Sequence, residues 1–208
     1  DIPTFRIYDA SEDMIYHAEP NENYGFSATQ MFFIDVINGG LAYELVLDGN
    51  ANLISFYTLP EDNSIENIIG ASSGNVSGIL TEGMAAVYIN NQWLGTLMEF
   101  DLTDGYWILV NEPSVSLSGL GSTYNPDRVY DLYAGPNLIS YPALGSSDLS
   151  SSIPDDVEDL FVAILGEGLA AMNTDGWVGS LSSFDEGAGY WVIISEDLSF
   201  SYETGSMA

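Results

Sequence analysis

Short apolar stretches recur along this chain, separated by polar turns rich in Gly, Asn, Asp and Pro. These stretches are rich in β-branched and aromatic residues, as in Leu53-Ile54-Ser55-Phe56-Tyr57. Runs of this length and composition, bounded by turn residues, are typical of β-strands rather than long helices. The pattern predicts a mainly β fold with short helices.

The order of apolar runs occurs twice, 85 residues apart at the first motif and 84 residues apart at the later ones. Such internal similarity predicts a tandem duplication of one folding unit. The matching segments are Asn52-Leu53-Ile54-Ser55 with Asn137-Leu138-Ile139-Ser140, Trp93-Leu94-Gly95 with Trp177-Val178-Gly179, Phe100-Asp101 with Phe184-Asp185, and Gly105-Tyr106-Trp107-Ile108 with Gly189-Tyr190-Trp191-Val192.

We therefore divide the chain into two tandem homologous β-rich units and a short N-terminal strand segment. The head covers residues 1–40, repeat unit 1 covers residues 41–119, and repeat unit 2 covers residues 130–203. Residues 119–127 are rich in Gly, Ser, Asn and Pro, as expected of a linker.

Each unit is expected to contain one short helix and one tight hairpin. In repeat one, Ser64 can cap a helix that carries three isoleucines and ends at Gly70. In repeat two, Asp155 or Asp156 can cap a helix over residues 157–161. The hairpins are expected around Asn90-Asn91 and around Asp175-Gly176, because Asn and Asp-Gly tolerate the backbone of a tight turn.

Matching apolar positions predict a separate core in each repeat. The expected core residues of repeat one are Leu53, Ile54, Ile68, Val87, Trp93, Leu97, Phe100, Tyr106 and Ile108. Those of repeat two are Leu138, Ile139, Leu160, Met172, Trp177, Leu181, Phe184, Tyr190 and Val192.

The head has its own alternation, with Phe5 and Ile7 on one side of a predicted first strand, and residues 31–37 form a second apolar run. Two strands alone are marginally stable in water. We expect the head to pack on a sheet edge, either of repeat one or of a neighbouring molecule.

Charge narrows the choice of partner. The chain has 31 acidic residues, two arginines and no lysine, for a net charge of −29. It cannot neutralise a phosphate backbone or an anionic membrane surface, which excludes nucleic acid as a partner. Cations, further copies of the chain or neutral polysaccharides remain, and adaptation to a salty medium is the simpler explanation of the charge.

Two further observations bear on location. No apolar run approaches the roughly 18 residues of a membrane span, so membrane insertion is not expected. The chain starts at Asp1 rather than Met, which suggests a mature secreted form or an excised fragment. The absence of cysteine excludes disulfides and thiolate metal sites.

Candidate catalytic chemistry is sparse. His17 is the only histidine, and it lies in a polar part of the head, as expected of a solvated surface residue. Glycoside hydrolysis needs only two carboxylates, but carboxylates are so abundant here that no pair stands out. We therefore expect a protein that is not an enzyme.

Calcium is the cofactor that the composition favours, because hard cations prefer oxygen ligands. A hairpin turn explains Asn173 and Asp175 equally well, and a helix N-terminus explains Asp155 and Asp156. The candidate ligands are Asp101 with Asp104, Asn173 with Asp175, Asp155 with Asp156 and Asp159, and Asp48 with Asn50.

Four tryptophans occupy matching places in the two repeats: Trp93, Trp107, Trp177 and Trp191. They could stack on sugars, but aromatic anchors of a duplicated core explain them more simply.

The repeated motifs resemble a module of large secreted and cell-surface bacterial proteins, with the order Asn-Leu-Ile-Ser, Trp-x-Gly and Gly-Tyr-Trp, often found in pairs. The head segment Phe5-Arg6-Ile7-Tyr8-Asp9-Ala10-Ser11 resembles the Ile-Tyr-Asp-Ala-Ser segment that often precedes such pairs. The resemblance implies an extracellular or cell-surface location, and it brings no activity with it.

Two functions are compatible with these observations. The first is a non-catalytic structural subunit of an extracellular or cell-surface assembly, which polymerises by strand addition and cation bridging, or joins other surface proteins. The second is a carbohydrate- or ligand-binding module of a larger secreted protein. The first predicts self-association through the head, and the second predicts an exposed strip of aromatic side chains.

Overall fold

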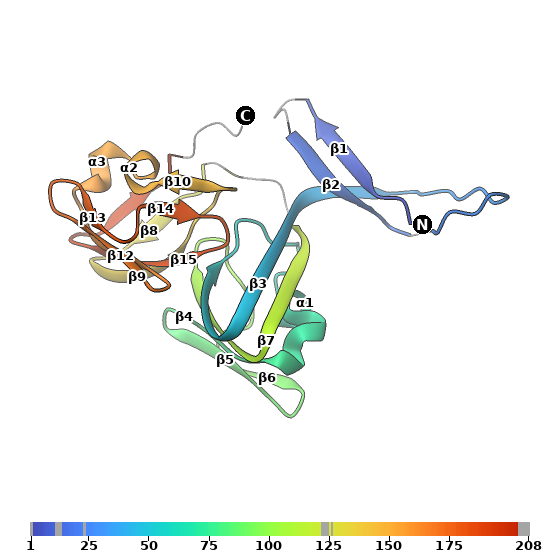
Figure 1. Ribbon diagram of the computed structural model, residues 1–208, viewed down its shortest axis with the longest axis horizontal. Helices are drawn as coiled ribbons and strands as arrows, with labels where there is room; N and C mark the ends of the chain where they lie inside the picture. Colours follow the sequence, from blue (N-terminus) through green and yellow to red (C-terminus); the bar gives the residue numbers. More distant parts are fainter. Residues whose placement is uncertain (1, 11–13, 23, 122–124, 126, 204–208) are drawn as a thin grey trace.

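The computed structural model describes residues 2–10, 14–22, 24–121, 125 and 127–203. These residues form several antiparallel sheets and three short α-helices, which confirms the predicted mainly β fold (Figure 1). Of the predicted linker, residues 122–124 and 126 lie outside the described residues. None of the helices in the described ranges combines the length and apolar character needed to cross a membrane.

Repeat one is built on one continuous sheet. Its central pair is the long antiparallel pair β3 (Ile37–Ser55) and β7 (Gly105–Gly121). The strands β4 (Val76–Thr81), β5 (Met84–Ile89) and β6 (Gln92–Gly95) follow outward from β7. The head strands β1 (Phe5–Asp9) and β2 (Met14–Pro20) extend the same sheet beyond β3 to seven strands.

Repeat two contains a five-stranded sheet in the order β13-β12-β11-β15-β9. Two small two-stranded sheets complete it, β8 with β16 and β10 with β14. The bounds are β8 (Tyr130–Leu132), β9 (Gly135–Ser140), β10 (Ser146–Asp148), β11 (Phe161–Gly166), β12 (Leu169–Asn173), β13 (Trp177–Gly179), β14 (Ser183–Asp185), β15 (Gly189–Ile194) and β16 (Leu198–Phe200).

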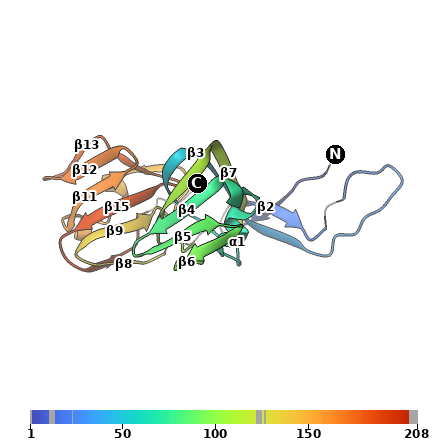
Figure 2. The ribbon, with the colours of Figure 1, turned by 90° about the horizontal axis from the view of Figure 1, so that it is seen from below.

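The main sheets of the two repeats have the same strand order and register. The order β3-β7-β4-β5-β6 in repeat one corresponds to β9-β15-β11-β12-β13 in repeat two, and the two sheets lie side by side in Figure 2. Leu53 pairs with Trp107 in the first sheet, as Leu138 pairs with Trp191 in the second. Each sheet also has an irregularity near the start of its third strand, at Val76/Gly78 and at Phe161/Ala163.

The asparagine that opens each repeated motif has the same task in both units. The Asp48 N–H donates to Asn52 Oδ1 and Asn52 Nδ2 donates to the Asp48 carbonyl, both at 2.8 Å. Asn137 exchanges the same two bonds with the backbone of Tyr133, at 3.1 and 2.8 Å. Because the side chain holds the backbone four residues upstream, it fixes the bend that leads into the Leu-Ile-Ser strand.

The helix of repeat one agrees with the prediction, and that of repeat two does not. α1 (Ile65–Ile69) begins after Ser64, whose side chain accepts from the Asn67 N–H, and it ends at Gly70 with φ 46°. A 3-10 turn, η1 (Gly70–Asn75), follows.

In repeat two the expected aspartate cap is wrong. α3 (Asp155–Glu158) begins after Pro154, with no side-chain cap. Phe161 belongs to β11 instead of the helix, because its backbone pairs with Ile194 in the sheet. A further one-turn helix, α2 (Leu149–Ser152), precedes α3.

The predicted hairpin turns are present. Asn90 and Asn91 have φ of 52° and 61°, and Asp175 has φ of 62°. These left-handed conformations suit Asn and Asp, and they connect β5 to β6 and β12 to β13.

Each repeat has its own core, but five predicted core residues lie outside it. Leu53 and Leu138 are buried on the opposite face of their sheets, and Leu160 is half-buried without joining the core of repeat two. The other two are exposed. Val87 is 42% exposed and Met172 is 55% exposed. The inward positions on these strands belong to Ala86 and Ala171, at 2% and 1% exposure. Since successive strand residues face opposite sides, an apolar residue beside an alanine does not reveal which of the two points inward.

The tryptophans divide between buried and half-buried positions. Trp93 lies in the core of repeat one, whereas Trp177 is half-buried and its Nε1 donates to Glu158 Oε1 at 2.7 Å. Trp107 and Trp191 are half-buried on the opposite face of each sheet from the core residues Tyr106 and Tyr190.

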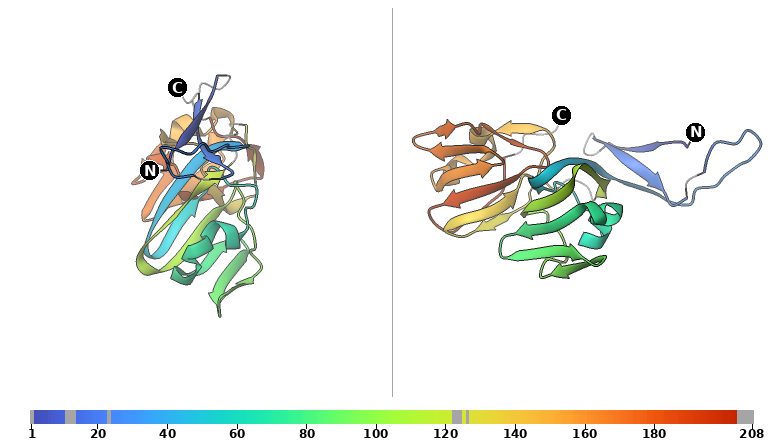
Figure 3. Two further views of the ribbon diagram at one scale, coloured as in Figure 1. Left: turned by 90° about the vertical axis from the view of Figure 1, so that its right-hand side faces the viewer. Right: turned by 60° about the horizontal axis from the view of Figure 1, so that its bottom comes forward.

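The head is a hairpin that projects from repeat one (Figure 3). β1 pairs with β2, and β2 pairs with the first residues of β3, from His17 opposite Gly40 to Pro20 opposite Ile37. The expected second head strand at residues 31–37 is therefore incorrect. Strand β3 starts only at Ile37, and residues 31–36 form no strand.

Candidate functional site

The two repeats meet through the edge strands of their main sheets. The Ser55 N–H at the end of β3 donates to the Gly187 carbonyl at 2.8 Å, and the Ser140 N–H at the end of β9 donates to the Thr103 carbonyl at 3.0 Å. Ser55 and Ser140 are equivalent in the duplication, and so are Thr103 and Gly187. We call this interface the repeat junction.

A glutamate from each repeat closes the same interface. Glu167 Oε2 accepts the Leu53 N–H at 2.9 Å, and Glu82 Oε2 accepts the Leu138 N–H at 3.2 Å. Both glutamates come from the turn between the third and fourth strands of their sheet and lie 85 residues apart. Each carboxylate thus satisfies a backbone donor that an edge strand would leave open to other chains.

These paired contacts give the junction a pseudo-twofold symmetry, like the isologous interface of a homodimer. The motif glycines Gly105 and Gly189 permit it. A Cβ on Gly105 would lie 2.9 Å from the Ile139 carbonyl oxygen, and one on Gly189 would lie 2.5 Å from that of Ile54. Glycine at these positions is therefore needed for the close approach of the two backbones.

The tyrosine that follows each glycine organises the adjacent loop. The Asp101 N–H donates to the Tyr106 hydroxyl at 2.6 Å, and the Asp185 N–H donates to the Tyr190 hydroxyl at 2.7 Å. Burial raises the pKa of both tyrosines, so both hydroxyls stay neutral. In each repeat the Phe-Asp motif and the Gly-Tyr-Trp motif thus form one local structure, in which the aspartate N–H of the first is bonded to the tyrosine hydroxyl of the second.

Arg128 fixes the end of the linker to repeat one. Its guanidinium is buried and donates to the Leu102 carbonyl at 3.2 Å and the Tyr57 carbonyl at 3.3 Å. One of the two cations of the chain therefore serves to hold backbone at the repeat junction rather than to bind a partner.

An acidic cavity of about 610 Å³ opens beside the repeat junction, and four carboxylates line it: Glu82, Asp101, Asp104 and Asp131. Burial, together with the charges of Asp101 and Glu82, raises the pKa of Asp104 to about 6. In repeat two the equivalent of Asp104 is Ala188, so the cavity has no exact counterpart across the pseudo-twofold axis.

The structure brings only one predicted cation pair to this cavity. Asp101 and Asp104 both line it, but Asp101 Oδ1 already accepts from the N–H and the hydroxyl of Thr103, at 2.7 and 2.6 Å. Within the described ranges, no cluster of three or more acidic or histidine side chains has an arrangement that could hold a metal ion.

The other predicted ligands lie elsewhere. Asn173 Oδ1 accepts the Gly176 N–H at 3.2 Å inside a hairpin turn, and Asp175 has the left-handed backbone of that turn. Asp155, Asp156 and Asp159 are exposed in and just after α3. Calcium binding stays a prediction.

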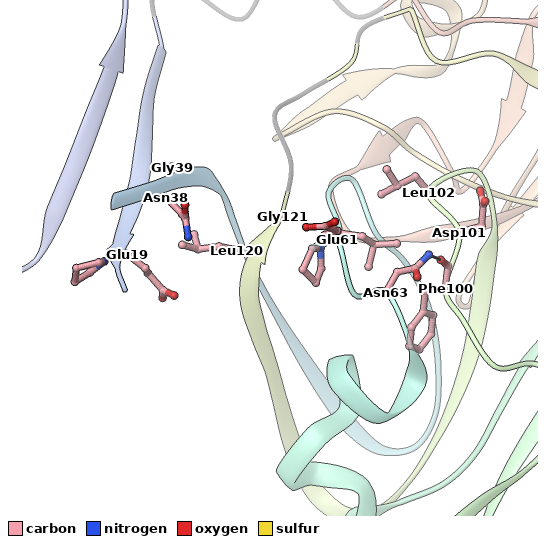
Figure 4. Close-up of a pocket in the computed structure, with 13 residues that line it drawn as sticks. Glu19, Asn38, Gly39, Glu61, Asn63, Phe100, Asp101, Leu102, Leu120 and Gly121 are labelled. Atoms are coloured by element: carbon pink, nitrogen blue, oxygen red, sulfur yellow. Dashed lines mark hydrogen bonds between the residues drawn. The ribbon is translucent and has the colours of Figure 1, made fainter. Parts of the chain in front are cut away.

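A second hollow, of about 840 Å³, separates the base of the head from repeat one (Figure 4). Glu19 and Asn38 lie on its head side, Glu61 near its middle and Asp101 on its far side. These polar groups come from different elements and are spread along the hollow, so they do not converge on one point. His17 is exposed and lines a different cavity, between β2 and the β3–β7 pair.

Sequence reasoning missed Glu82, Glu167 and Arg128. A signal existed for the glutamates, since Glu82-Gly83 and Glu167-Gly168 recur at the offset of the first motif. No local signal marks Arg128, whose partners lie 26 and 71 residues away along the chain.

No family model, curated protein or solved structure matches this chain.

Proposed function

We propose that this protein is a non-catalytic structural module of an extracellular or cell-surface assembly, in which copies associate by strand addition at the head, with cations between their acidic surfaces. The module class is that of the tandem repeats of secreted bacterial proteins that its motifs resemble. The observation that carries the proposal is the head hairpin, which projects from the repeats and ends in the edge strand β1.

The edge strand supports this proposal through its position. β1 is the outermost strand of the seven-stranded sheet, and β2 is its ladder partner on the inner side. Edge strands readily accept a further strand from another chain. Ile7 and Tyr8 of β1 are exposed, which gives an added strand large side chains to cover.

The packing of the two repeats also supports the proposed strand addition at the head. Edge strands at the repeat junction are covered by backbone and glutamate hydrogen bonds, so the junction offers no competing site for strand addition. A contact between the head of one copy and a different surface of the next is heterologous, and a heterologous contact that does not close produces a filament.

Deletion of residues 1–9 tests the proposal. β1 contacts the rest of the sheet through β2, so the deletion leaves β2 paired with β3 and both cores intact. We expect the full chain to form filaments that are visible by electron microscopy, and the deletion variant to be folded by circular dichroism without forming them. Filaments of the deletion variant, or a full chain that stays monomeric at high concentration and high salt, would overturn the proposal.

One observation favours ligand binding as a second candidate function. An apolar cavity of about 490 Å³ lies in the head, and Tyr24 and Phe32 in its lining are stacked with ring centroids 4.4 Å apart. Aromatic side chains of this kind bind sugar rings or other apolar faces. Titration calorimetry with neutral polysaccharides would show binding that Phe32→Ala removes if this function is correct, and no heat in either protein if it is not.

A further inference from the structure

Repeat one has a second apolar face, on the side of its sheet away from the core. Tyr106 and Ile108 are fully buried, so strand alternation turns Trp107 and Leu109 to the other side. Register places Leu53 and Leu80 on either side of Trp107, and places Val87 opposite Leu94. The outer face of repeat one is defined by Leu53, Leu80, Val87, Leu94, Trp107 and Leu109.

Repeat two has the same face. Leu138 and Leu165 flank Trp191, and Met172 lies opposite Val178. The outer face of repeat two is defined by Leu138, Leu165, Met172, Val178, Trp191 and Ile193, which are the equivalents of the six residues of repeat one.

All six positions are apolar in both copies of the unit, although several of them face solvent. Leu94 is 51% exposed and Val178 is 65% exposed. Carboxylates lie at the inner ends of these faces, where Glu82 and Glu167 accept the N–H groups of Leu138 and Leu53. Apolar residues retained on an exposed sheet face in both copies indicate a surface that is covered in the working state.

We propose that the outer faces dock a second copy of this chain, so that an outer face of one copy packs on an outer face of another as the two sheets of a β-sandwich do. The proposal rests on the proposed function, to which it adds a lateral contact between the filaments that the head builds. Because each chain has two such faces, one copy can contact two lateral neighbours, and the association continues into bundles.

Continuity with the repeat junction supports a protein partner. Leu53 and Leu138 belong to the outer faces, but they are only 4% and 3% exposed because the other repeat covers them. The outer faces therefore already take part in one contact between folded units, the two repeats of the chain, at their inner ends. A second copy that packs beyond these leucines extends the same apolar interface.

Charge and polarity select a second copy over other partners. A chain with a charge of −29 approaches its own kind most readily where free carboxylates are few. Glu82 and Glu167 at the inner ends of the outer faces already accept backbone N–H groups of the opposite repeat. A sugar site needs converging hydrogen-bonding groups, whereas the residues paired with Trp107 and Trp191 on the adjacent strands are all leucines.

The test compares the full chain with Leu94→Asp/Val178→Asp, which places one carboxylate on each outer face. The control is Val46→Asp. It adds one carboxylate, as each of the two substitutions in the double variant does, at a residue that is 65% exposed on β3 and lies outside both outer faces. Circular dichroism and thermal melting establish that all three proteins are folded. Electron microscopy then shows bundles or single filaments, and sedimentation velocity in high salt measures association.

We expect bundles of the full chain and of the control, and single filaments of the double variant, with lateral association weakened about tenfold or more. Bundles of the double variant that equal those of the full chain, or a full chain that forms only single filaments, would overturn the lateral contact and leave the proposed function standing. Association of the full chain that the double variant loses, without any head-dependent filament, would support the lateral contact and overturn strand addition at the head. Loss of binding to neutral lipid vesicles or to polysaccharide instead of loss of association would assign the outer faces to a different partner and overturn the proposal.

Discussion

At the scale of single residues, the repeat junction depends on a few side chains that satisfy backbone groups. Glu82 and Glu167 accept N–H groups of the opposite repeat, and Arg128 donates to two carbonyls. In the described ranges, every buried side-chain nitrogen or oxygen atom has a hydrogen-bond partner. Because an unsatisfied buried group is costly, the removal of one such side chain has a measurable effect on stability.

Replacement of Glu167 by alanine should lower the free energy of unfolding by about 1–2 kcal/mol, because it leaves the Leu53 N–H without its acceptor. Urea unfolding measures this change. The matched control is Glu196→Ala, an exposed glutamate in repeat two. Equal effects of the two substitutions would contradict a role of Glu167 at the repeat junction.

Replacement of Asp104 by asparagine should make the protein more stable at neutral pH but not in acid. The carboxyl ionises near its usual value of 3.8 in the unfolded chain and near 6 in the folded protein. A raised folded pKa favours the folded state at low pH, and this contribution is lost as the pH rises through 6.

The asparagine variant escapes that loss, so we expect a gain of about 1–2 kcal/mol at pH 7.5 that disappears below pH 4. Urea unfolding across this pH range measures it. A gain of the same size at every pH would show that the carboxyl charge is not its cause.

At the scale of elements, the close approach of two strand ends decides how the repeats fit together. Gly189 at the start of β15 lies against the backbone of Ile54 at the end of β3, and Gly105 at the start of β7 lies against Ile139 in β9. Backbone atoms cannot move aside as a flexible side chain can. The junction therefore has little tolerance for a larger residue at either glycine.

Replacement of Gly189 by alanine should destabilise the protein by about 1–3 kcal/mol, since its Cβ would lie 2.5 Å from the Ile54 carbonyl oxygen. Thermal melting is the measurement. Gly74→Ala is the control, because no atom lies within 4 Å of its added Cβ. A melting temperature of the Gly189 variant that equals that of the control would show that the strand ends separate at no cost.

At the scale of the whole molecule, net charge is the dominant property. A charge of −29 repels within one copy and between copies. Salt screens both effects, over about 10 Å at 0.1 M and about 3 Å at 1 M. Stability and association should therefore both increase with ionic strength.

Calcium should raise the melting temperature more than sodium does at equal ionic strength, if specific sites exist, because a ligand bound only by the folded state adds stability by mass action. The comparison uses calcium chloride, sodium chloride and a chelator control. Equal shifts of the melting temperature in the two salts would show that cations act by screening alone. A melting temperature that neither salt changes would show that cations have no role in stability.

Local features were predictable because they depend on neighbouring residues. The Ser64 cap, the Asn90-Asn91 turn and the alternating strands follow from backbone preferences within a few residues. The duplication was predictable for another reason, since it is a property of the sequence itself. Partners of the capping and turn residues are close in the chain, so no distant contact can change them.

The sequence alone determined the β class, the two repeats and their turns, because these follow from periodicity and local conformation. Tertiary structure decided which side of β5 and β12 faces inward, where Ala86 and Ala171 fill the core and leave Val87 and Met172 outside. Both sides of these strands are apolar, so the period of two could not distinguish them. Tertiary structure also decided the repeat junction. Glu167 and Leu53 are 114 residues apart along the chain, and they meet only when the two sheets pack edge to edge.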